Sequence, residues 1–288
     1  MDRRLGPRGQ GRVGRHGISQ AGRPVVTLLT DFGNRDPFVG IMKGVILQLC
    51  PEALVVDLTH EVGSCDILGA SFLLRSAVGF FPRGTIHLAV VDPGVGGPRR
   101  PILASIDSQL FVAPDNGLLS YPMAFGTVQL IRALTASEFF LDPVSATFHG
   151  RDVFAPVAGH LARGVARERF GPLIADVIRL PIPTPRLDML GKVEGQVIWI
   201  DRFGNCVTNI RREEFEALAR GAESNVHISL AGRPVGRMVR YFAEAGVGGS
   251  GGIFGSTGHL ELFIHQGDLA REWGVVPGTA VYLESQPS

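Results

Sequence analysis

Apolar runs alternate with amphipathic stretches through the first half of the chain. Residues 25–30, 53–59 and 85–91 are short apolar runs that predict strands, and residues 85–91 are typical of a strand buried on both faces of a sheet. Between them, residues 38–49 place apolar side chains three and four positions apart, and residues 66–81 form a second helical stretch. This order of strands and helices predicts a parallel sheet with right-handed crossovers.

Polar residues and prolines mark the expected helix starts. We expect Asp36 to cap the helix that follows it, with Pro37 in the first turn, and Asp66 to cap the next helix. Asp152 is expected to cap a later helix, just beyond His149. Free backbone N–H groups at such a helix start favour a bound anion.

The pattern changes to short strands in the last third of the chain. A proline-rich segment predicts a linker at residues 184–191. Beyond it, short apolar runs such as residues 236–242 are separated by glycine-rich turns, with one helix near residues 212–220 and a flexible loop at residues 245–255. This spacing predicts a small β-barrel or sandwich.

Composition adds the domain count to this picture. The chain has 288 residues, 45% of them hydrophobic, which is enough for about two domains with substantial cores. Residues 1–24 are rich in Arg and Gly and are predicted to be a disordered basic tail. We predict an N-terminal α/β/α domain with a mostly parallel central sheet at 25–183, then the linker at 184–191, then a smaller C-terminal β-barrel-like domain at 192–288.

Composition also argues against several classes of protein. No apolar run approaches the ~18 residues of a membrane helix. The net charge is +1, and because the tail carries six Arg and one Asp, the rest of the chain sums to about −4. Its arginines are scattered, so no nucleic-acid partner is expected. Cys50, Cys65 and Cys206 lie far apart, which predicts neither a disulfide framework nor a zinc site and favours a reducing cytoplasm.

The first candidate catalytic residues lie where the predicted strand at residues 85–91 ends at a carboxylate. Asp92 precedes a loop rich in Pro and Gly that returns the chain to Arg99, and Asp31 ends another strand in the same way. Ligands of open α/β sheets bind at the carboxyl ends of the strands, so we place the site at this edge. An ion pair that only pins a tight loop is an equally good interpretation of Asp92 and Arg99.

Six motifs in a fixed order carry a family resemblance. They are TDFG, DPGVGxxRR, PDNG, FHGRDxFAP, DRFGN and STGHLE, and the likeness that they mark covers about Pro24 to Glu284. This set resembles the S-adenosyl-L-methionine (SAM) hydroxide adenosyltransferases, which are adenosine-forming SAM hydrolases related to fluorinase and chlorinase, and it implies a bacterial protein.

The resemblance implies that water attacks C5′ of the SAM ribose and displaces L-methionine, with no cofactor and no metal. The family's polar trio falls on Asp92, Arg99 and His149. Gly150 stands where fluorinase has a halide-binding serine, and Asp92 where it has a tyrosine, so both positions favour hydrolysis over halogenation. We expect His149, oriented by Asp92, to accept the proton of the attacking water, while Arg99 and the amides near Gly150 steady the developing charge.

The resemblance also implies substrate contacts. Asp31 corresponds to the carboxylate that holds the ribose hydroxyls. The contacts with adenine and with the amino acid fall on residues of the last third of the chain. Asp201 corresponds to the contact with the methionine amine, and Ser256 to the contact with the methionine carboxylate. Asn205 corresponds to an adenine contact, Tyr241 to a residue that stacks on adenine, and Glu261 lies in the adjoining strand. Turn formation is the competing interpretation for Asp201, Asn205 and Ser256.

Three positions at which fluorinase binds or adjoins its substrate carry different residues here. Cys65 replaces a tryptophan near the substrate, Thr257 an arginine at the amino-acid carboxylate, and Phe38 a serine that helps bind the amino acid. The resemblance further implies a homotrimer in which each site is shared between neighbouring subunits. The sequence alone leaves closure within one chain equally open.

The sequence leaves other functions open. The chain could be a SAM or adenosine binding module without catalysis, or a SAM-dependent halogenase. A metal-dependent phosphoesterase could be drawn from six residues: Asp31, Asp92, Asp115, Asn116, His149 and Asp152. Four histidines have no motif partner and are interpreted as core or surface residues: His60, His87, His160 and His259.

Overall fold

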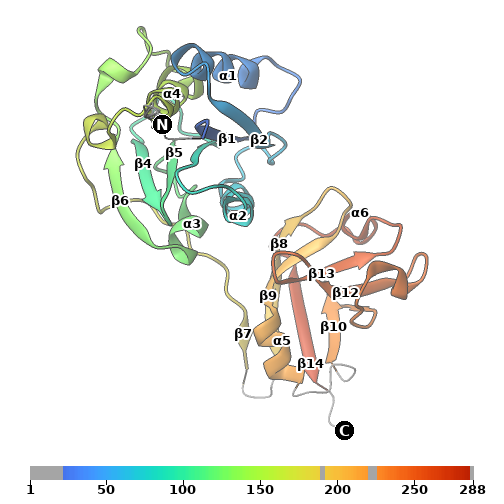
Figure 1. The fold of residues 1–288 in the computed structure, drawn as a ribbon. Coiled ribbons are helices and arrows are strands. Elements are labelled where there is room, and N and C mark those ends of the chain that lie inside the picture. The colour runs from blue at the N-terminus through green and yellow to red at the C-terminus, as the bar shows by residue number, and fades with distance from the viewer. Residues whose placement is uncertain (1–21, 189–191, 220–225, 286–288) are drawn as a thin grey trace, which may run out of the picture.

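The computed structural model describes residues 22–188, 192–219 and 226–285, and it contains two β-sheets (Figure 1). The first has six strands in the order β2-β1-β3-β5-β4-β6. Neighbours β2, β1, β3 and β5 are parallel, whereas β4 is antiparallel to both β5 and β6. The strands are β1 (Val25–Thr30), β2 (Leu54–Thr59), β3 (Ile86–Val90), β4 (Pro101–Ile106), β5 (Gln109–Pro114) and β6 (Val128–Ala133). The predicted mostly parallel sheet is confirmed.

The second sheet is antiparallel and nearly closed. Its order is β11-β10-β14-β8-β9-β13-β12, with β7 on β8, and a parallel bridge between Met238 and Gly252 joins its two ends. The strands are β7 (Arg186–Leu187), β8 (Val193–Ile200), β9 (Cys206–Arg211), β10 (Val226–Leu230), β11 (Arg233–Val235), β12 (Ser250–Phe254), β13 (His259–Ile264) and β14 (Ala280–Ser285). Helices α5 (Arg212–Ala219) and α6 (Leu269–Trp273) flank it. The barrel-like prediction is confirmed.

Two predicted segments of this part differ from the structure. Residues 236–242 do not form a strand, because only Met238 makes a bridge and the chain turns into a short 3-10 helix at Phe242–Ala245. The glycine-rich segment predicted as a flexible loop contains β12, where Gly251 and Gly252 let β12 lie close to the side chains of Phe263 and Met238.

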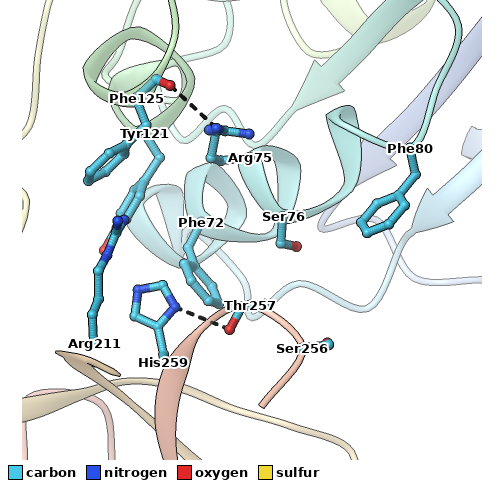
Figure 2. Close-up of a pocket in the computed structure, with 10 residues that line it drawn as sticks. All are labelled: Phe72, Arg75, Ser76, Phe80, Tyr121, Phe125, Arg211, Ser256, Thr257 and His259. Atoms are coloured by element: carbon cyan, nitrogen blue, oxygen red, sulfur yellow. Dashed lines mark hydrogen bonds between the residues drawn. The ribbon is translucent and has the colours of Figure 1, made fainter. Parts of the chain in front are cut away.

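The two sheets contact each other through side chains of α2 (Ile67–Val78) and α3 (Ser120–Phe125). Phe72 and Tyr121 pack with Val207 of β9 in one buried cluster, and the Phe72 ring lies 5.5 Å from the ring of His259 (Figure 2). Burial of aromatic rings fixes this contact by the hydrophobic effect. The exact boundaries stay a prediction: a first domain that ends at residue 183, a linker at 184–191 and a second domain that begins at residue 192.

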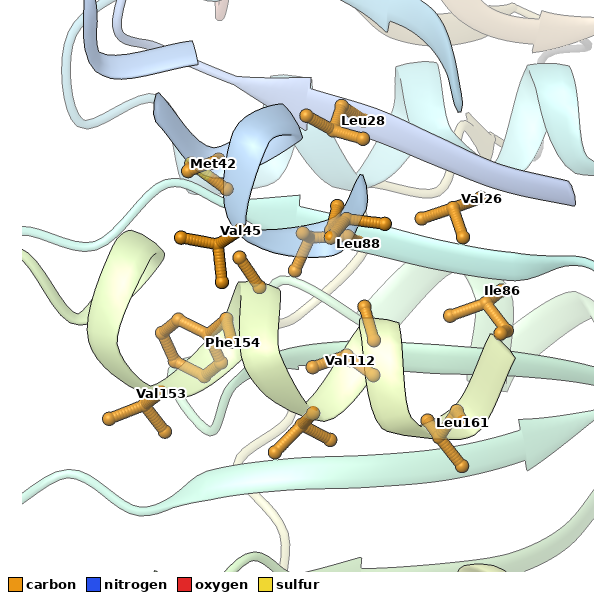
Figure 3. Packing of buried hydrophobic residues seen from close by; sticks show 14 of the residues in the cluster. Val26, Leu28, Met42, Val45, Ile86, Leu88, Val112, Val153, Phe154 and Leu161 are labelled. Atoms are coloured by element: carbon orange, nitrogen blue, oxygen red, sulfur yellow. The ribbon is translucent and has the colours of Figure 1, made fainter. Parts of the chain in front are cut away.

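Helices cover both faces of the first sheet because each strand presents alternate residues to each side. Val26 and Leu28 of β1 pack under α1 (Phe38–Leu49) and α4 (Ala155–Ala162) (Figure 3). Leu29 points to the other face and packs under α2 and α3. The intervening segments include 3-10 turns at Ser137–Phe139 and Arg167–Phe170. This gives the three layers expected from the sequence.

The expected helix caps are partly right. Asp66 accepts a hydrogen bond from the backbone N–H of Gly69 at 2.9 Å, as a cap should. Asp36 is not a cap, because α1 begins at Phe38 after Pro37 without a side-chain cap. Asp152 lies inside a π-helical turn at Gly150–Phe154 that precedes α4, so its carboxylate does not cap that helix.

Part of the predicted tail, residues 1–21, lies outside the described residues, as do linker residues 189–191. In the described part of the chain, no helix is long and apolar enough to span a bilayer.

Candidate active site

Asp92, Arg99 and His149 meet just beyond the carboxyl end of β3. The Nε atom of Arg99 lies 3.0 and 2.9 Å from the two carboxylate oxygens of Asp92, and its Nη2 also contacts Asp92. The same Nη2 lies 2.8 Å from Nδ1 of His149. The side chains of Asp92 and Arg99 are only 4% and 9% exposed. The predicted convergence is therefore present, with Arg99 at its centre.

The loop that returns Arg99 to Asp92 is held in place by contacts that require glycine. Gly96 has φ +75°, and a Cβ there would collide with the carbonyl oxygen of Ala146 in the segment before His149. Asn116 donates to the carbonyl of Val91 at 2.8 Å and so supports the chain directly before Asp92. The DPGVGG and PDNG motifs thus shape the same edge of the sheet.

Asp152 orders the segment of the chain that leads into His149. The Asp152 carboxylate accepts the backbone N–H of Ser145 at 2.8 Å and pairs with Arg151. The Ser145 hydroxyl in turn accepts the N–H of Phe148 at 3.1 Å. Asp152 is 1% exposed, so this pairing orders the chain that leads into His149.

The charge state of His149 follows from its neighbours. Burial lowers the pKa of His149, the positive charge of Arg99 lowers it further, and Asp92 and Asp152 oppose these effects. Because a guanidinium can only donate, Nδ1 of His149 must accept, and the neutral ring then carries its proton on Nε2. The expectation that Asp92 orients His149 is wrong, since Arg99 lies between them.

Asp31 lies at the same edge of the sheet. Thr30 of β1 pairs with Val90 of β3 in parallel register, so Asp31 and Asp92 follow neighbouring strand ends. One carboxylate oxygen of Asp31 accepts the N–H of Cys65 at 3.0 Å. The predicted ribose-binding carboxylate therefore ends the strand next to β3, which leads into Asp92.

Gly150 is enclosed by sulfur and aromatic groups. A Cβ at this position would lie 3.1 Å from the Met42 sulfur, 3.2 Å from Phe148 and 3.4 Å from Phe32. The rings of Phe32, Phe38 and Phe148 pack edge to face, with centroids 5.2 to 6.1 Å apart. A side chain here would press on this aromatic cluster.

Asp201 and Asn205 occupy the turn between β8 and β9. Asp201 accepts the N–H groups of Phe203 and Asn205 at 2.8 and 2.9 Å and the Asn205 side-chain amide at 2.8 Å. These bonds shape the turn. Both residues also line a cavity of about 470 Å³ together with Glu261 and the exposed Phe203. Burial, and then the charge of Asp201, raise the pKa of Glu261.

Sequence reasoning missed two aromatic side chains at this cavity. Phe203 is 73% exposed at the tip of the turn, and Phe242 lines the same cavity. Tyr241, predicted to stack on adenine, is 57% exposed and precedes Phe242. The sequence does contain an indication of a binding role for Phe203. Turns favour small and polar residues, so a phenylalanine in the polar turn DRFGN indicates a contact with a ligand or a partner.

Ser256 lies at a different cavity, of about 480 Å³, between the two sheets (Figure 2). Its walls come from α2, α3, β9 and the segment leading into β13, including Arg75, Arg211 and His259. Arg75 donates to the carbonyl of Phe125 at 3.3 Å, and the Arg211 guanidinium lies 4.6 Å from the Phe125 ring centroid. The trio lines neither of these two cavities.

The carboxylates of the phosphoesterase alternative do not converge. Asp92 pairs with Arg99, Asp115 with Arg100, and Asp152 with Arg151. Each carboxylate faces its own guanidinium, and this arrangement does not suit shared ligation of a cation.

Comparisons with known proteins agree with these motifs. Family models described as the N-terminal and C-terminal domains of SAM hydroxide adenosyltransferases match residues 26–171 and 195–282. The (R)-S-adenosyl-L-methionine hydrolase of Thermus thermophilus is 35% identical over 277 residues, covering 91% of this chain and 99% of that protein. The protein of that name from Salinispora tropica is 36% identical over 258 residues, covering 88% and 95%.

The fold also matches a solved structure. The crystal structure of an uncharacterized conserved protein from Thermotoga maritima has a TM-score of 0.85 and 34% identity, covering 90% of this chain and 99% of that one. The chain therefore belongs to the SAM hydroxide adenosyltransferase family.

Proposed function

We propose that this protein hydrolyses SAM to adenosine and L-methionine by attack of water at C5′ of the ribose. The observation that carries the proposal is the Arg99 guanidinium, which donates to Asp92 and to His149 at once at the carboxyl end of β3. Relatives named (R)-S-adenosyl-L-methionine hydrolase, 35% and 36% identical over most of the chain, support the choice of substrate.

The reaction requires help for the nucleophile only. Methionine departs as a neutral thioether, so its leaving needs no acid. Water has a pKa of about 15.7 and must lose a proton as it attacks, or be held as incipient hydroxide by positive neighbours. A carboxylate, a guanidinium and an imidazole in one cluster supply both kinds of help.

The hydrogen bonds favour Asp92 as the proton acceptor. The lone pair on Nδ1 of His149 is taken by Arg99, and its Nε2 carries a proton, so His149 is arranged to donate. Asp92 is the one anion of the trio. Arg99 and the Nε2–H of His149 then stabilise the negative charge that develops on the water oxygen, and nucleophilic substitution proceeds opposite the departing sulfur.

The binding roles extend the same proposal. Asp31 accepts the ribose hydroxyls, and Gly150, whose backbone follows His149 directly and packs against the aromatic cluster, contributes backbone contacts to the substrate. The remaining contacts come from the part of the chain that forms the second sheet, Glu261 from β13 and the others from segments between its strands: Asp201, Asn205, Tyr241, Ser256 and Glu261. Asp201 still has acceptor capacity beyond its turn bonds, since an ionised carboxylate offers about four lone-pair sites.

We propose a homotrimer with each site shared between neighbours. The trio lies on the first sheet, whereas Asp201, Asn205 and Glu261 line a cavity on the second, without any of the trio. Exposed aromatic side chains beside that cavity, Phe203 and Phe242 among them, fit a surface covered by another subunit. The free thiols of all three cysteines agree with the cytoplasmic location that we propose.

The deciding experiment identifies the products formed from SAM with and without chloride. Equal amounts of adenosine and methionine in both conditions, unaffected by a chelator, are expected. A 5′-chloro nucleoside would show a halogenase, loss of turnover on chelation a metal enzyme, and binding without product a non-catalytic module. Any of these three results would overturn the proposal.

A further inference from the structure

His60 is a buried histidine that the proposed reaction does not use. It follows β2 and is 3% exposed. Its Nδ1 lies 2.8 Å from the hydroxyl of Thr30, and its Nε2 lies 3.0 Å from a carboxylate oxygen of Asp57 in an oblique contact. Lys43 bonds the other oxygen of Asp57 at 2.6 Å. Four polar side chains therefore run from the surface to the end of β1.

The direction of each hydrogen bond follows from the chemistry of the groups. An imidazole nitrogen 3.0 Å from a carboxylate oxygen carries its proton, so His60 presents an N–H at Nε2 and a lone pair at Nδ1. Thr30 then donates its hydroxyl proton to Nδ1. Its oxygen stays free to accept the backbone N–H of Phe32, which lies 3.2 Å away.

Asp57 is the charged end of this network. Burial by itself would raise the pKa of Asp57, but the hydrogen bond from Lys43 and the close contact with the His60 ring outweigh burial and hold it below the usual value. Asp57 therefore stays ionised at neutral pH and keeps the proton of His60 on Nε2.

The network reaches Asp31 from both sides. Thr30 precedes Asp31 in the chain, and the residue after it, Phe32, donates to the Thr30 hydroxyl. The carbonyl of His60 accepts the N–H of Gly33 at 2.8 Å. The loop that starts at His60 then returns, and the N–H of Cys65 bonds the Asp31 carboxylate at 3.0 Å. The loops after β1 and β2 are thus joined around Asp31, and His60 is their buried anchor.

We propose that His60, backed by Asp57, is a positioning residue that orients the Asp31 carboxylate toward the two ribose hydroxyls of the substrate. This inference rests on the proposed function, because Asp31 meets ribose only if the substrate is a nucleoside. A carboxylate that accepts two neighbouring hydroxyls must be held at a defined angle. Loss of the anchor therefore weakens ribose recognition and leaves the reaction at C5′, which other residues carry, unchanged.

The test compares adenosine with 2′,3′-dideoxyadenosine, which lacks both ribose hydroxyls. In Thr30→Val and in His60→Leu the dissociation constant of adenosine should rise about tenfold, while that of dideoxyadenosine changes less than about twofold. Thr30→Ser, which retains the hydroxyl, should restore adenosine binding. Thr85→Val makes the same change at another buried threonine, bonded to Pro82, and should alter neither constant.

Turnover gives a second readout. Thr30→Val should raise KM for SAM about tenfold and leave kcat within about threefold, because uniform binding is lost rather than transition-state stabilisation. A parallel loss of affinity for both nucleosides in variants that melt like the wild type would overturn the inference, since it would indicate a general structural role.

A third measurement needs no ligand. Hydrogen exchange at the amides of Gly33 and Cys65 should accelerate in Thr30→Val and not in Thr30→Ser, and equal exchange in both would also overturn the inference. The two proposals fail differently. A wild-type protein that binds adenosine and forms none from SAM overturns the proposed function alone, whereas one that binds no adenosine overturns both.

Discussion

At the scale of single residues, Arg99 connects the candidate site, because its guanidinium contacts both Asp92 and His149. Its side chain and that of Asp92 are nearly buried, so each charge depends on the other for compensation. Removing one member of such a pair costs about 3–5 kcal/mol, because the remaining charge is left buried and unpaired. Variants of the trio must therefore be compared for stability as well as for rate.

Replacing Asp92 by Asn tests its proposed role with the least change of shape. Turnover of SAM should fall by about 10²–10⁴-fold, because the amide cannot accept the proton of water. The affinity for adenosine should stay near that of the wild type, as measured by calorimetry.

Asp176→Asn is the matched control for this change. Asp176 pairs with Arg100 at 3.0 Å and is largely exposed, so the same substitution removes an exposed ion pair of the arginine next to Arg99 without changing a member of the trio. It should leave turnover unchanged. An active Asp92→Asn protein would remove Asp92 from the mechanism.

His87 makes stability depend on pH. It is fully buried between Thr27 and Gln109, and burial, opposed by the bond to Gln109, lowers its pKa to about 4. The unfolded chain takes up this proton below pH ~6.5 and the native state only below about 4, so acidification favours unfolding. The free energy of unfolding should fall by about 3 kcal/mol across this window.

Urea unfolding of the wild type and of His87→Gln between pH 7 and pH 4 checks the prediction. Other histidines contribute to both proteins, so the difference between the two pH profiles reports His87. Profiles with the same slope would show that His87 titrates normally in the native state.

At this scale the sequence predicted which residues meet, but not how they bond. The motifs indicated Asp92, Arg99 and His149, and all three converge. That Arg99 lies between the other two could not be predicted, because it depends on the path of a loop held against Ala146. The sequence predicts only a core or surface position for His60. Its contact with Asp57 is local, three residues apart, whereas its contact with Thr30 depends on the pairing of β1 with β2.

The elements of the first sheet explain why the site lies where it does. β1 and β3 are parallel neighbours, so Asp31 and Asp92 reach one edge. β4 breaks the parallel pattern because Asp107 and Ser108, both with positive φ, form a two-residue turn into β5, and a turn this short permits only antiparallel pairing.

Gly96→Ala tests the loop between Asp92 and Arg99. The added methyl group meets the Ala146 carbonyl and should separate Arg99 from His149, lowering kcat at least about tenfold. Gly84 also has positive φ but open space around it, so Gly84→Ala carries the same backbone cost of about 1–2 kcal/mol without the collision.

Thermal melting and steady-state turnover of both variants separate the two effects. Gly84→Ala should lose stability and retain kcat. If both glycine variants retained full kcat, contact between the loop and the segment before His149 would play no part in catalysis.

The whole molecule decides whether the site is complete in one chain. Asp92→Asn and Asn205→Ala inactivate opposite halves of the proposed shared site. Mixed trimers formed by co-expression should recover about a quarter of the wild-type activity, because one site in four then combines two intact halves. Light scattering should report three subunits.

Each inactive variant alone is the control for the mixture. A mixture that stays inactive although subunits have exchanged would place both halves of the site in the same chain. A monomer with full activity would exclude the shared site outright.

The sequence by itself determined the layered α/β arrangement, the barrel-like second part and the family, because these depend on local hydrophobic periods and on short motifs. It missed β12, whose glycines lack a strand signature and which forms only because β13 offers a partner. Tertiary structure decided the order of the hydrogen bonds in the trio, the contacts that join His60 to the loops around Asp31, and the placing of Ser256 and Asp201 at different cavities. These depend on distances between groups far apart in the chain, which only packing sets.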